Sequence, residues 1–324
     1  MSVQVGLLYS RIRTDEKLLL SELRDRGHEV EKIDVRKTAF GVGAAGGESA
    51  TEQSGTLGDG EATDAKSILQ DCDLVLDRCL ATSRSLYATR FAESHGVPVV
   101  NSPETARVCA DKVETSLALS EAGVPTPETA VAFDTDTALE VVESFGYPCV
   151  LKPVVGSWGR LMAKLDTRSA AEAVLEHKAT LGHYEHKVFY VQQFVDKPGR
   201  DLRILTLDGE PVAGMARSGD HWLTNAKRGA ETDTFEIDAE AEALARAAAD
   251  AVGGGLLGVD LMETGDSYTV HEVNHTVEFT ALNDTVETDV AAAVVDWLET
   301  KVADGDGQGD EQSTDSGIEV NVSP

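Results

Sequence analysis

The first 103 residues alternate between short apolar runs and segments with helical spacing. Apolar runs occupy residues 3–10 and 28–35, and the segment 18–23 between them is rich in leucine. Short apolar runs favour buried strands, whereas leucines three and four positions apart favour a helix. Because strands and helices that alternate along a chain form parallel sheets, we predict an α/β domain over residues 1–103.

The rest of the sequence predicts two further subdomains, which gives an α/β (α+β) protein. Helical patterns occur at 104–122, 136–145, 168–181, 238–252 and 286–302, with β-rich sequence between them. We place a central subdomain at 104–186 and a C-terminal subdomain at 187–302. Residues 38–66 are rich in Gly, Ala, Ser, Thr and acids, and we expect a flexible insertion there. Residues 303–324 are polar and acidic, and we expect a disordered tail.

The formal net charge is −29, and the acidic residues are spread along the entire chain. Such acidity repels nucleic acids and anionic membranes, which excludes partners of those two classes. Molar salt, with a Debye length of about 3 Å, screens the repulsion. The charge therefore indicates a salt-rich cytoplasm; acidity that only aids solubility is the alternative. The four cysteines lack C-x-x-C spacing, and neither an 18-residue apolar run nor a signal-peptide pattern occurs. We expect a reduced, soluble, cytoplasmic protein without a structural zinc.

The pentapeptide His271-Glu272-Val273-Asn274-His275 matches the zinc-protease pattern H-E-x-x-H. That chemistry requires a helix that brings both imidazoles to one zinc ion. The surrounding sequence is rich in Thr and Val and follows the turn residues "TGDS", which favours a strand. In a strand, Glu272 and Asn274 share one face, and the two histidines lie on the other face about 13 Å apart. We therefore predict that this motif is not a zinc peptidase site.

Asp260 in "GVDLM" lies in the strand pattern that precedes the one with Glu272 and Asn274. A turn of three residues, 265–267, places Asp260 directly opposite Glu272, whereas a two-residue turn points Asp260 to the other face. Carboxylate and amide oxygens are ligands that Mg²⁺ prefers, and this ion bridges nucleotide phosphates. The sequence thus predicts a metal site formed by Asp260, Glu272 and Asn274. An ordinary solvated sheet face is the alternative.

Two lysines fall where a helix or a strand meets a turn, Lys112 in "CADKVETS" and Lys152 in "CVLKPVVGSWG". The loop after the second lysine contains Gly156, Ser157, Trp158 and Gly159. Glycines let backbone amides approach an anion closely, so this loop is suited to cover phosphates. It lacks the G-K-[ST] of a Walker A loop. Phosphate binding is one interpretation, and a surface lysine beside a mobile turn is the other.

The order of these motifs resembles the ATP-grasp carboxylate–amine ligases, in the branch that contains RimK and the carrier-protein ligases LysX and ArgX. Lys112 is followed by "KPVVGSWG", "VQQFV", "GRDLRILTLDGE", "TNAKRG", "GVD" and "HEVN". The resemblance extends from the N-terminal strand to about residue 300, and only the 38–66 insertion and the tail lie outside it. It implies an ATP-grasp fold with an N-terminal pre-ATP-grasp domain, and it implies ATP and two Mg²⁺ ions as cofactors.

The resemblance also implies a role for each residue of the site. Phosphates would be contacted by Lys112, Lys152 and the glycine loop. Adenine and ribose would be held by Gln192, Gln193, Phe194, Val195 and Asp201. The metal ions would be held by Asp260, Glu272 and Asn274. The transferring phosphoryl group would be contacted by Arg203, Arg217 and Asn225, with Lys227 and Arg228 in the same loop.

The reaction implied by the resemblance forms an amide through an acyl phosphate. The substrates would be the C-terminal glutamate of the small acidic carrier protein LysW and the amino group of glutamate or α-aminoadipate, in arginine or lysine biosynthesis. Candidates for binding the carboxylates of the amino acid are Arg78, Arg84 and Arg203. The alternatives are a RimK-type ligase that adds glutamate to a protein or peptide, and an ATP-binding module without ligase activity. Relatives of this kind also imply a homo-oligomer.

Overall fold

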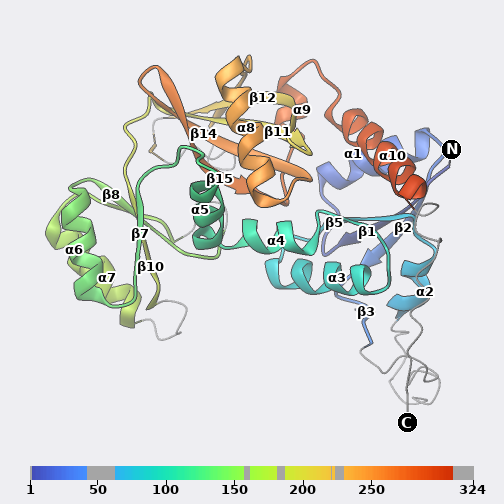
Figure 1. The fold of residues 1–324 in the computed structure, drawn as a ribbon, viewed down its shortest axis with the longest axis horizontal. Helices are drawn as coiled ribbons and strands as arrows, with labels where there is room; N and C mark the ends of the chain where they lie inside the picture. The colour runs from blue at the N-terminus through green and yellow to red at the C-terminus, as the bar shows by residue number, and fades with distance from the viewer. Residues whose placement is uncertain are drawn as a thin grey trace, which may run out of the picture.

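The computed structural model describes residues 2–41, 63–156, 161–180, 187–219, 221–222 and 230–308 (Figure 1). In this part of the chain, three sheets of four or five strands carry the fold. They follow one another along the sequence as an N-terminal, a central and a C-terminal sheet. Within the same ranges, no helix is both long and apolar enough to cross a lipid bilayer.

The N-terminal domain is a parallel sheet with strand order β2-β1-β5-β6. Its elements are β1 (Gln4–Tyr9), α1 (Thr14–Asp25), β2 (Glu29–Asp34), α2 (Ala65–Gln70), β5 (Leu74–Arg78), α3 (Thr82–Ser94) and β6 (Val99–Val100). Two short strands, β3 (Thr38–Ala39) and β4 (Thr63–Asp64), pair in parallel at the ends of the predicted insertion. Residues 42–62 of the predicted insertion, 38–66, lie outside the described part. The predicted parallel α/β domain is confirmed.

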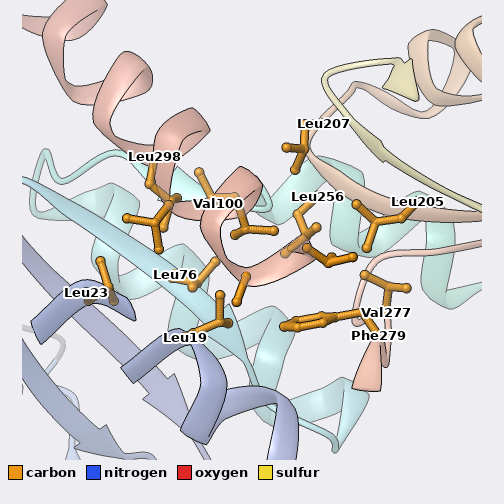
Figure 2. Close-up of a cluster of buried hydrophobic side chains, with 14 of the residues drawn as sticks. Leu19, Leu23, Leu76, Val100, Leu205, Leu207, Leu256, Val277, Phe279 and Leu298 are labelled. Carbon is orange, nitrogen blue, oxygen red and sulfur yellow. The ribbon is translucent and has the colours of Figure 1, made fainter. Parts of the chain in front are cut away.

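Both faces of this sheet are covered, because successive side chains of a strand point to opposite sides. On one face, Leu7 belongs to a buried cluster with Leu19 of α1 and Leu298 of α10 (Val290–Gln308); Figure 2 shows the last two. On the other face, Leu8 packs with residues of α3. Full burial of one leucine contributes roughly 1.5–3 kcal/mol. The last helix of the chain therefore completes the core of the first domain.

Two helices, α4 (Pro103–Ala110) and α5 (Lys112–Glu121), lead into the central subdomain. The sequence predicted a single helix over 104–122, and this is wrong at one residue. Asp111 leaves the helical conformation, with φ −111° and ψ 118°. Its carboxylate accepts hydrogen bonds from the amides of the second and third residues of α5, at 2.8 and 3.2 Å. This N-cap fixes Lys112 as the first residue of α5.

The central sheet is antiparallel, with strand order β7-β10-β8-β9. Its elements are β7 (Thr129–Ala132), α6 (Thr135–Phe145), β8 (Cys149–Lys152), β9 (Ala163–Leu165), α7 (Arg168–Thr180) and β10 (Phe189–Gln193). The predicted boundary at 186/187 assigned β10 to the next subdomain. Because β10 pairs with both β7 and β8, it belongs to the central sheet, and the chain crosses to the next sheet after Gln193.

The C-terminal sheet is also antiparallel, with strand order β13-β12-β11-β14-β15. Its elements are β11 (Arg200–Leu207), β12 (Glu210–Ser218), β13 (Glu231–Thr234), α8 (Ala239–Val252), β14 (Leu256–Thr264), β15 (Ser267–Asn274) and α9 (Thr280–Thr285). Helix α10 continues past position 302, so residues 303–308 of the predicted disordered tail are helical. Residues 309–324 lie outside the described part.

Candidate active site

A cavity of about 700 Å³ is lined by residues from all three sheets. Its walls come from the loops that follow β1 and β5, from β8 and β10, and from β11, β12, β14 and β15. The described residues that were predicted to bind ATP, the metal ions or the transferring phosphoryl group all line it, namely Lys112, Lys152, Gly156, Gln192, Gln193, Phe194, Val195, Asp201, Arg203, Arg217, Asp260, Glu272 and Asn274. The other predicted residues, Ser157, Trp158, Gly159, Asn225, Lys227 and Arg228, lie outside the described part.

The hairpin of β14 and β15 carries the predicted metal ligands. Its turn has two residues, because Thr264 pairs with Ser267. We expected a two-residue turn to point Asp260 to the other face, and this is wrong, because Asp260 does pair with Glu272. The register shifts by one residue beyond Asp260, where His271 is an extra residue in β15. Such a β-bulge re-aims side chains without changing the turn, and here it brings both acids to the cavity.

The prediction for the two histidines is right in one part and wrong in another, and the bulge explains the difference. The segment is a strand, as predicted, so the helical geometry of a zinc peptidase is not present. However, we predicted that both imidazoles point away from the face of Glu272, and both His271 and His275 line the cavity. The reason is that His271 occupies the bulge and His275 follows the end of β15, so strict alternation no longer applies.

Asp260 is buried between two arginines. Arg203, its partner across β11 and β14, donates two hydrogen bonds to it, of 2.7 and 2.6 Å, and Arg217 donates one of 2.9 Å. Burial acts to raise the pKa of Asp260, but the charges of both arginines and the hydrogen bonds of Arg203 outweigh it and hold the pKa far below its usual range. Asn274 donates a further bond of 3.3 Å. Asp260 therefore contacts Asn274 directly and pairs with Glu272 across the hairpin.

Glu272 is held by the first residue of α5. Lys112 Nζ lies 2.8 Å from Glu272 Oε1 and donates another hydrogen bond, of 2.9 Å, to the carbonyl of Gly156. Burial acts to raise the pKa of Glu272, and the positive charge of Lys112 outweighs it, so the net direction is downward. Because Gly156 opens the glycine loop, Lys112 links the loop to the acidic hairpin.

Lys152 ends β8 and is almost completely buried, with 3% exposed. Its ammonium donates to Gln192 Oε1 on β10 and lies 3.2 Å from His271 Nδ1. Burial lowers the pKa of Lys152 to about 7 and the pKa of His271 to about 3. The imidazole is therefore neutral and can accept from the lysine. Gln192 in turn donates to Thr129 and to Tyr190, so its side chain positions Lys152.

Apolar residues from the central and C-terminal sheets also line the cavity. Phe194 and Val195 follow β10, Val150 lies on β8 and Met262 lies on β14, and all four line the cavity. Asp201, at the start of β11, pairs with Lys197 in the same wall. A flat aromatic group fits between such apolar walls, with polar groups at its edge.

Comparison with known proteins places this fold and cavity in a family. The model of the RimK-like ATP-grasp domain matches residues 109–298, and that of the LysX preATP-grasp domain matches residues 5–53 and 60–108. The chain belongs to the RimK-like ATP-grasp family. The pre-ATP-grasp domain and the ATP-grasp fold implied by the sequence are thereby confirmed.

Relatives with assigned activities cover most of this ATP-grasp chain. An α-aminoadipate–LysW ligase LysX from Sulfurisphaera tokodaii is 31% identical over 85% of this chain and 90% of its own length. A glutamate–LysW ligase ArgX from Sulfolobus acidocaldarius is 30% identical over 70% of this chain and 81% of its own. A crystal structure of a RimK domain ATP-grasp protein from Sphaerobacter thermophilus has a TM-score of 0.71 and 29% identity, and the match covers 91% and 98% of the two chains.

The arginines predicted to bind carboxylates occupy three different places in this ATP-grasp protein. Arg203 lines the cavity but is committed to Asp260. Arg78 is completely buried against Glu16 and the carbonyl of Val277, and it is not part of the cavity wall. Arg84 is exposed on α3, also away from the wall. Arg78 and Arg84 are therefore not in place to touch a ligand in the cavity.

Several wall residues were missed from the sequence. Trp222, Arg11 and Arg13 line the cavity, although no motif drew attention to them. Arg11 and Arg13 follow β1 directly, and the carboxyl ends of strands in a parallel sheet are where ligands bind. That rule would have selected the two arginines once the parallel sheet was predicted.

Proposed function

We propose that this protein is an ATP-dependent carboxylate–amine ligase that acts on a carrier protein of the LysW type. It joins the C-terminal glutamate side chain of the carrier to the amino group of glutamate or α-aminoadipate. The observation that carries the proposal is the cavity itself, in which an acid–amide cluster around Asp260 faces the two lysines expected to bind phosphates. Family membership and the LysX and ArgX relatives support the choice of substrates.

The residues present fit a nucleotide with magnesium. Among the described residues, Arg217 Nε is a buried donor without a hydrogen-bond acceptor, on a side chain that lines the cavity, and a phosphate oxygen would supply the acceptor. Asp260, Glu272 and Asn274 form the oxygen-rich set that suits Mg²⁺, and we infer two ions. The ions, when bound, neutralise negative charge on the phosphates. The ATP-grasp ligase PsnB, which has been solved in complex with Mg and ADP, is 18% identical with a TM-score of 0.65 and is similar in fold alone.

The chemistry proceeds in two steps. A carboxylate oxygen of the carrier glutamate attacks the γ-phosphorus of ATP, the bond to the bridging oxygen breaks, and ADP leaves with an acyl phosphate formed. The unprotonated amine of the amino acid then attacks the acyl carbon, and inorganic phosphate leaves with the electron pair of the broken C–O bond. Arg203 and Arg217 donate to the oxygens on which charge develops. No side chain of the protein forms a covalent bond.

Three further expectations accompany the proposal. The resemblance of the sequence to this branch predicts a homo-oligomer, which light scattering measures directly. The composition predicts a cytoplasmic location and a salt-rich host. The resemblance to ATP-grasp ligases predicts adenine nucleotide specificity, so ATP should support the reaction and GTP should not.

The decisive experiment measures ADP release. Purified protein is mixed with ATP, Mg²⁺ and either glutamate or α-aminoadipate, with and without a carrier that ends in glutamate. Release that requires both the carrier and an amino acid, together with a mass increase of the carrier by one amino-acid residue, supports the proposal. Nucleotide binding without such release identifies a binding module and rejects the ligase. Modification of an unrelated peptide ending in glutamate, at the same rate as the carrier, favours the RimK-type alternative.

A further inference from the structure

The N-terminal wall of the cavity lies at a special position of the parallel sheet. The chain leaves β1 for β2 on one side and returns to β5 on the other, so strand order reverses between β1 and β5. In open parallel sheets, ligands bind outside the carboxyl ends of the strands at such a reversal. Arg11 follows β1, Leu80 and Thr82 follow β5, and all three line the cavity.

Arg11 differs from the other cations of the wall. The ion pairs are Arg13 with Glu16 and Glu278, Lys112 with Glu272, Lys197 with Asp201, and both Arg203 and Arg217 with Asp260. Lys152 donates to two uncharged acceptors. Within the described part of the chain, Arg11 is exposed and makes neither an ion pair nor a side-chain hydrogen bond. In a protein of net charge −29, an arginine without an acid is available to a ligand.

The loop that carries Arg11 is held firmly against the C-terminal subdomain. Arg13 Nη1 lies 2.8 Å from Glu278 Oε1. Asp15 accepts hydrogen bonds from the amides of Phe279 and Thr280, at 2.7 and 2.8 Å. These bonds join the start of α1 to the start of α9 and fix the backbone on which Arg11 stands. The guanidinium is therefore presented from a rigid support, which favours specific binding.

The residues of the wall come from different domains. The predicted phosphate, adenine and metal residues come from α5, the glycine loop and the central and C-terminal subdomains, whereas Arg11 comes from the N-terminal domain. Arg11 is therefore not among the residues expected to hold ATP. Under the proposed function, the carrier glutamate and the amino acid also have to bind in the cavity, and each brings a carboxylate that does not react. The amino acid has two, and the carrier has its terminal α-carboxylate.

We propose that Arg11 binds a non-reacting carboxylate of an acceptor or donor substrate and thereby sets specificity for acidic reactants. The proposal rests on the ligase function inferred above. A guanidinium offers two parallel N–H donors that match the two oxygens of a carboxylate, a geometry that a lysine does not reproduce. Thr82, the first residue of the 13-residue helix α3, also lines the cavity.

The test compares Arg11→Ala and Arg11→Lys with wild type in the ADP-release assay. KM is measured separately for the amino acid, for the carrier and for ATP. Loss of a charged bidentate contact should raise one substrate KM by about 10- to 100-fold in Arg11→Ala, with a smaller rise in Arg11→Lys. KM for ATP should stay within about twofold. Arg24→Ala is the control, because Arg24 is exposed on α1 and is not part of the cavity wall.

The source of the carboxylate follows from which KM changes. A rise for the amino acid assigns the contact to glutamate or α-aminoadipate, and a rise for the carrier assigns it to the terminal carboxylate of the carrier. Either result supports a carboxylate site at Arg11. Substrate KM values that stay within about twofold of wild type, or an equal rise that includes ATP, overturn it. A wild-type protein that releases no ADP with any carrier and amino acid rejects the ligase function itself, and this inference falls with it.

Discussion

Asp260 and Glu272 face each other across β14 and β15 although their hairpin turn has only two residues. With that turn and regular pairing, Asp260 would sit opposite His271, and Glu272 would point to the other face. His271 is an extra residue in β15, and it shifts the register by one so that Asp260 pairs with Glu272. The same bulge brings the imidazole of His271 to Lys152. One inserted residue thus assembles both the acidic pair and the support of a buried lysine.

Removal of the charge from Glu272 should abolish most activity without unfolding the protein. In Glu272→Gln, we expect kcat to fall by about 100- to 1000-fold and the required Mg²⁺ concentration to rise, because one carboxylate ligand and the partner of Lys112 are lost. The matched control is Glu263→Gln on the same hairpin, because the ion pair of Glu263 within the described ranges is with the exposed Arg200. Steady-state ADP release over a Mg²⁺ titration measures both. Equal activity of the two variants contradicts the metal assignment.

ATP affinity should weaken as pH rises above neutrality. Burial lowers the pKa of Lys152 to about 7, so below that pH the side chain is charged and attracts phosphate, and above it the charge is lost. We expect the Kd for ATP to increase between pH 6 and 8.5 in wild type and to be flat, though weaker, in Lys152→Met. Calorimetry at each pH provides the measurement. Parallel profiles for the two proteins would assign the pH dependence to another group.

Stability in acid should depend on Glu16. Burial acts to raise the pKa of Glu16, but hydrogen bonds and charge from Arg13 and the charge of Arg78 outweigh it, so the folded-state pKa lies below the usual value. A lowered pKa stabilises the fold above the unfolded-state value, about 4.3, and this contribution is lost as pH falls through the folded-state value. Urea unfolding of Glu16→Gln should show a smaller decline below pH 5 than wild type.

The same variant should be less stable at neutral pH. Glu16 and Arg78 are both fully buried, and removal of one partner leaves the other charge uncompensated, at a cost of about 3–5 kcal/mol. The exposed pair Arg168 and Glu172 offers a control, in which Glu172→Gln should change the free energy of unfolding by less than about 1 kcal/mol. A Glu16→Gln protein as stable as the control variant would show that the buried pair contributes nothing net.

Modification of an acidic carrier should become faster with salt. The enzyme carries a net charge of −29, so two acidic proteins repel at long range, and molar salt reduces the Debye length to about 3 Å. We expect kcat/KM for the carrier to rise from low to molar KCl while the enzyme remains folded by circular dichroism. A steady decline over the same range would mean that local attraction near the cavity outweighs the net repulsion.

The sequence was sufficient for most helices and strands and for the choice of the charged residues at the centre of the predicted metal and phosphate site. Apolar periodicity predicted the parallel sheet, and residue chemistry combined with the family resemblance selected Lys152, Asp260 and Glu272, all of which line the cavity. The residues of each motif lie on one strand or helix, or on two that adjoin in the sequence. Their spacing along the chain was therefore enough to predict which of them lie close together. The predicted roles of these residues remain to be measured by the experiments above.

The features that could not be predicted depend on contacts distant in the sequence or on a single inserted residue. A bulge changes neither composition nor local alternation, so nothing in "TVHEVN" distinguishes it from a regular strand. Gly265, with φ 68°, occupies the first turn position, which suits a two-residue turn, and the requirement for glycine there was overlooked. Arg11 becomes part of the wall only because the start of α1 is bonded to residues 279 and 280.

The packing of α10 on the first domain has a consequence for synthesis of the chain. Leu298 belongs to the same buried cluster as Leu7 and Leu19, so one face of the first sheet is only partly covered, by α1, until the last helix has emerged from the ribosome. At about 5–20 residues per second, roughly 15 to 60 s separate translation of the two ends. Newly made N-terminal strands therefore expose apolar surface during that interval, and chaperone binding should be concentrated on them.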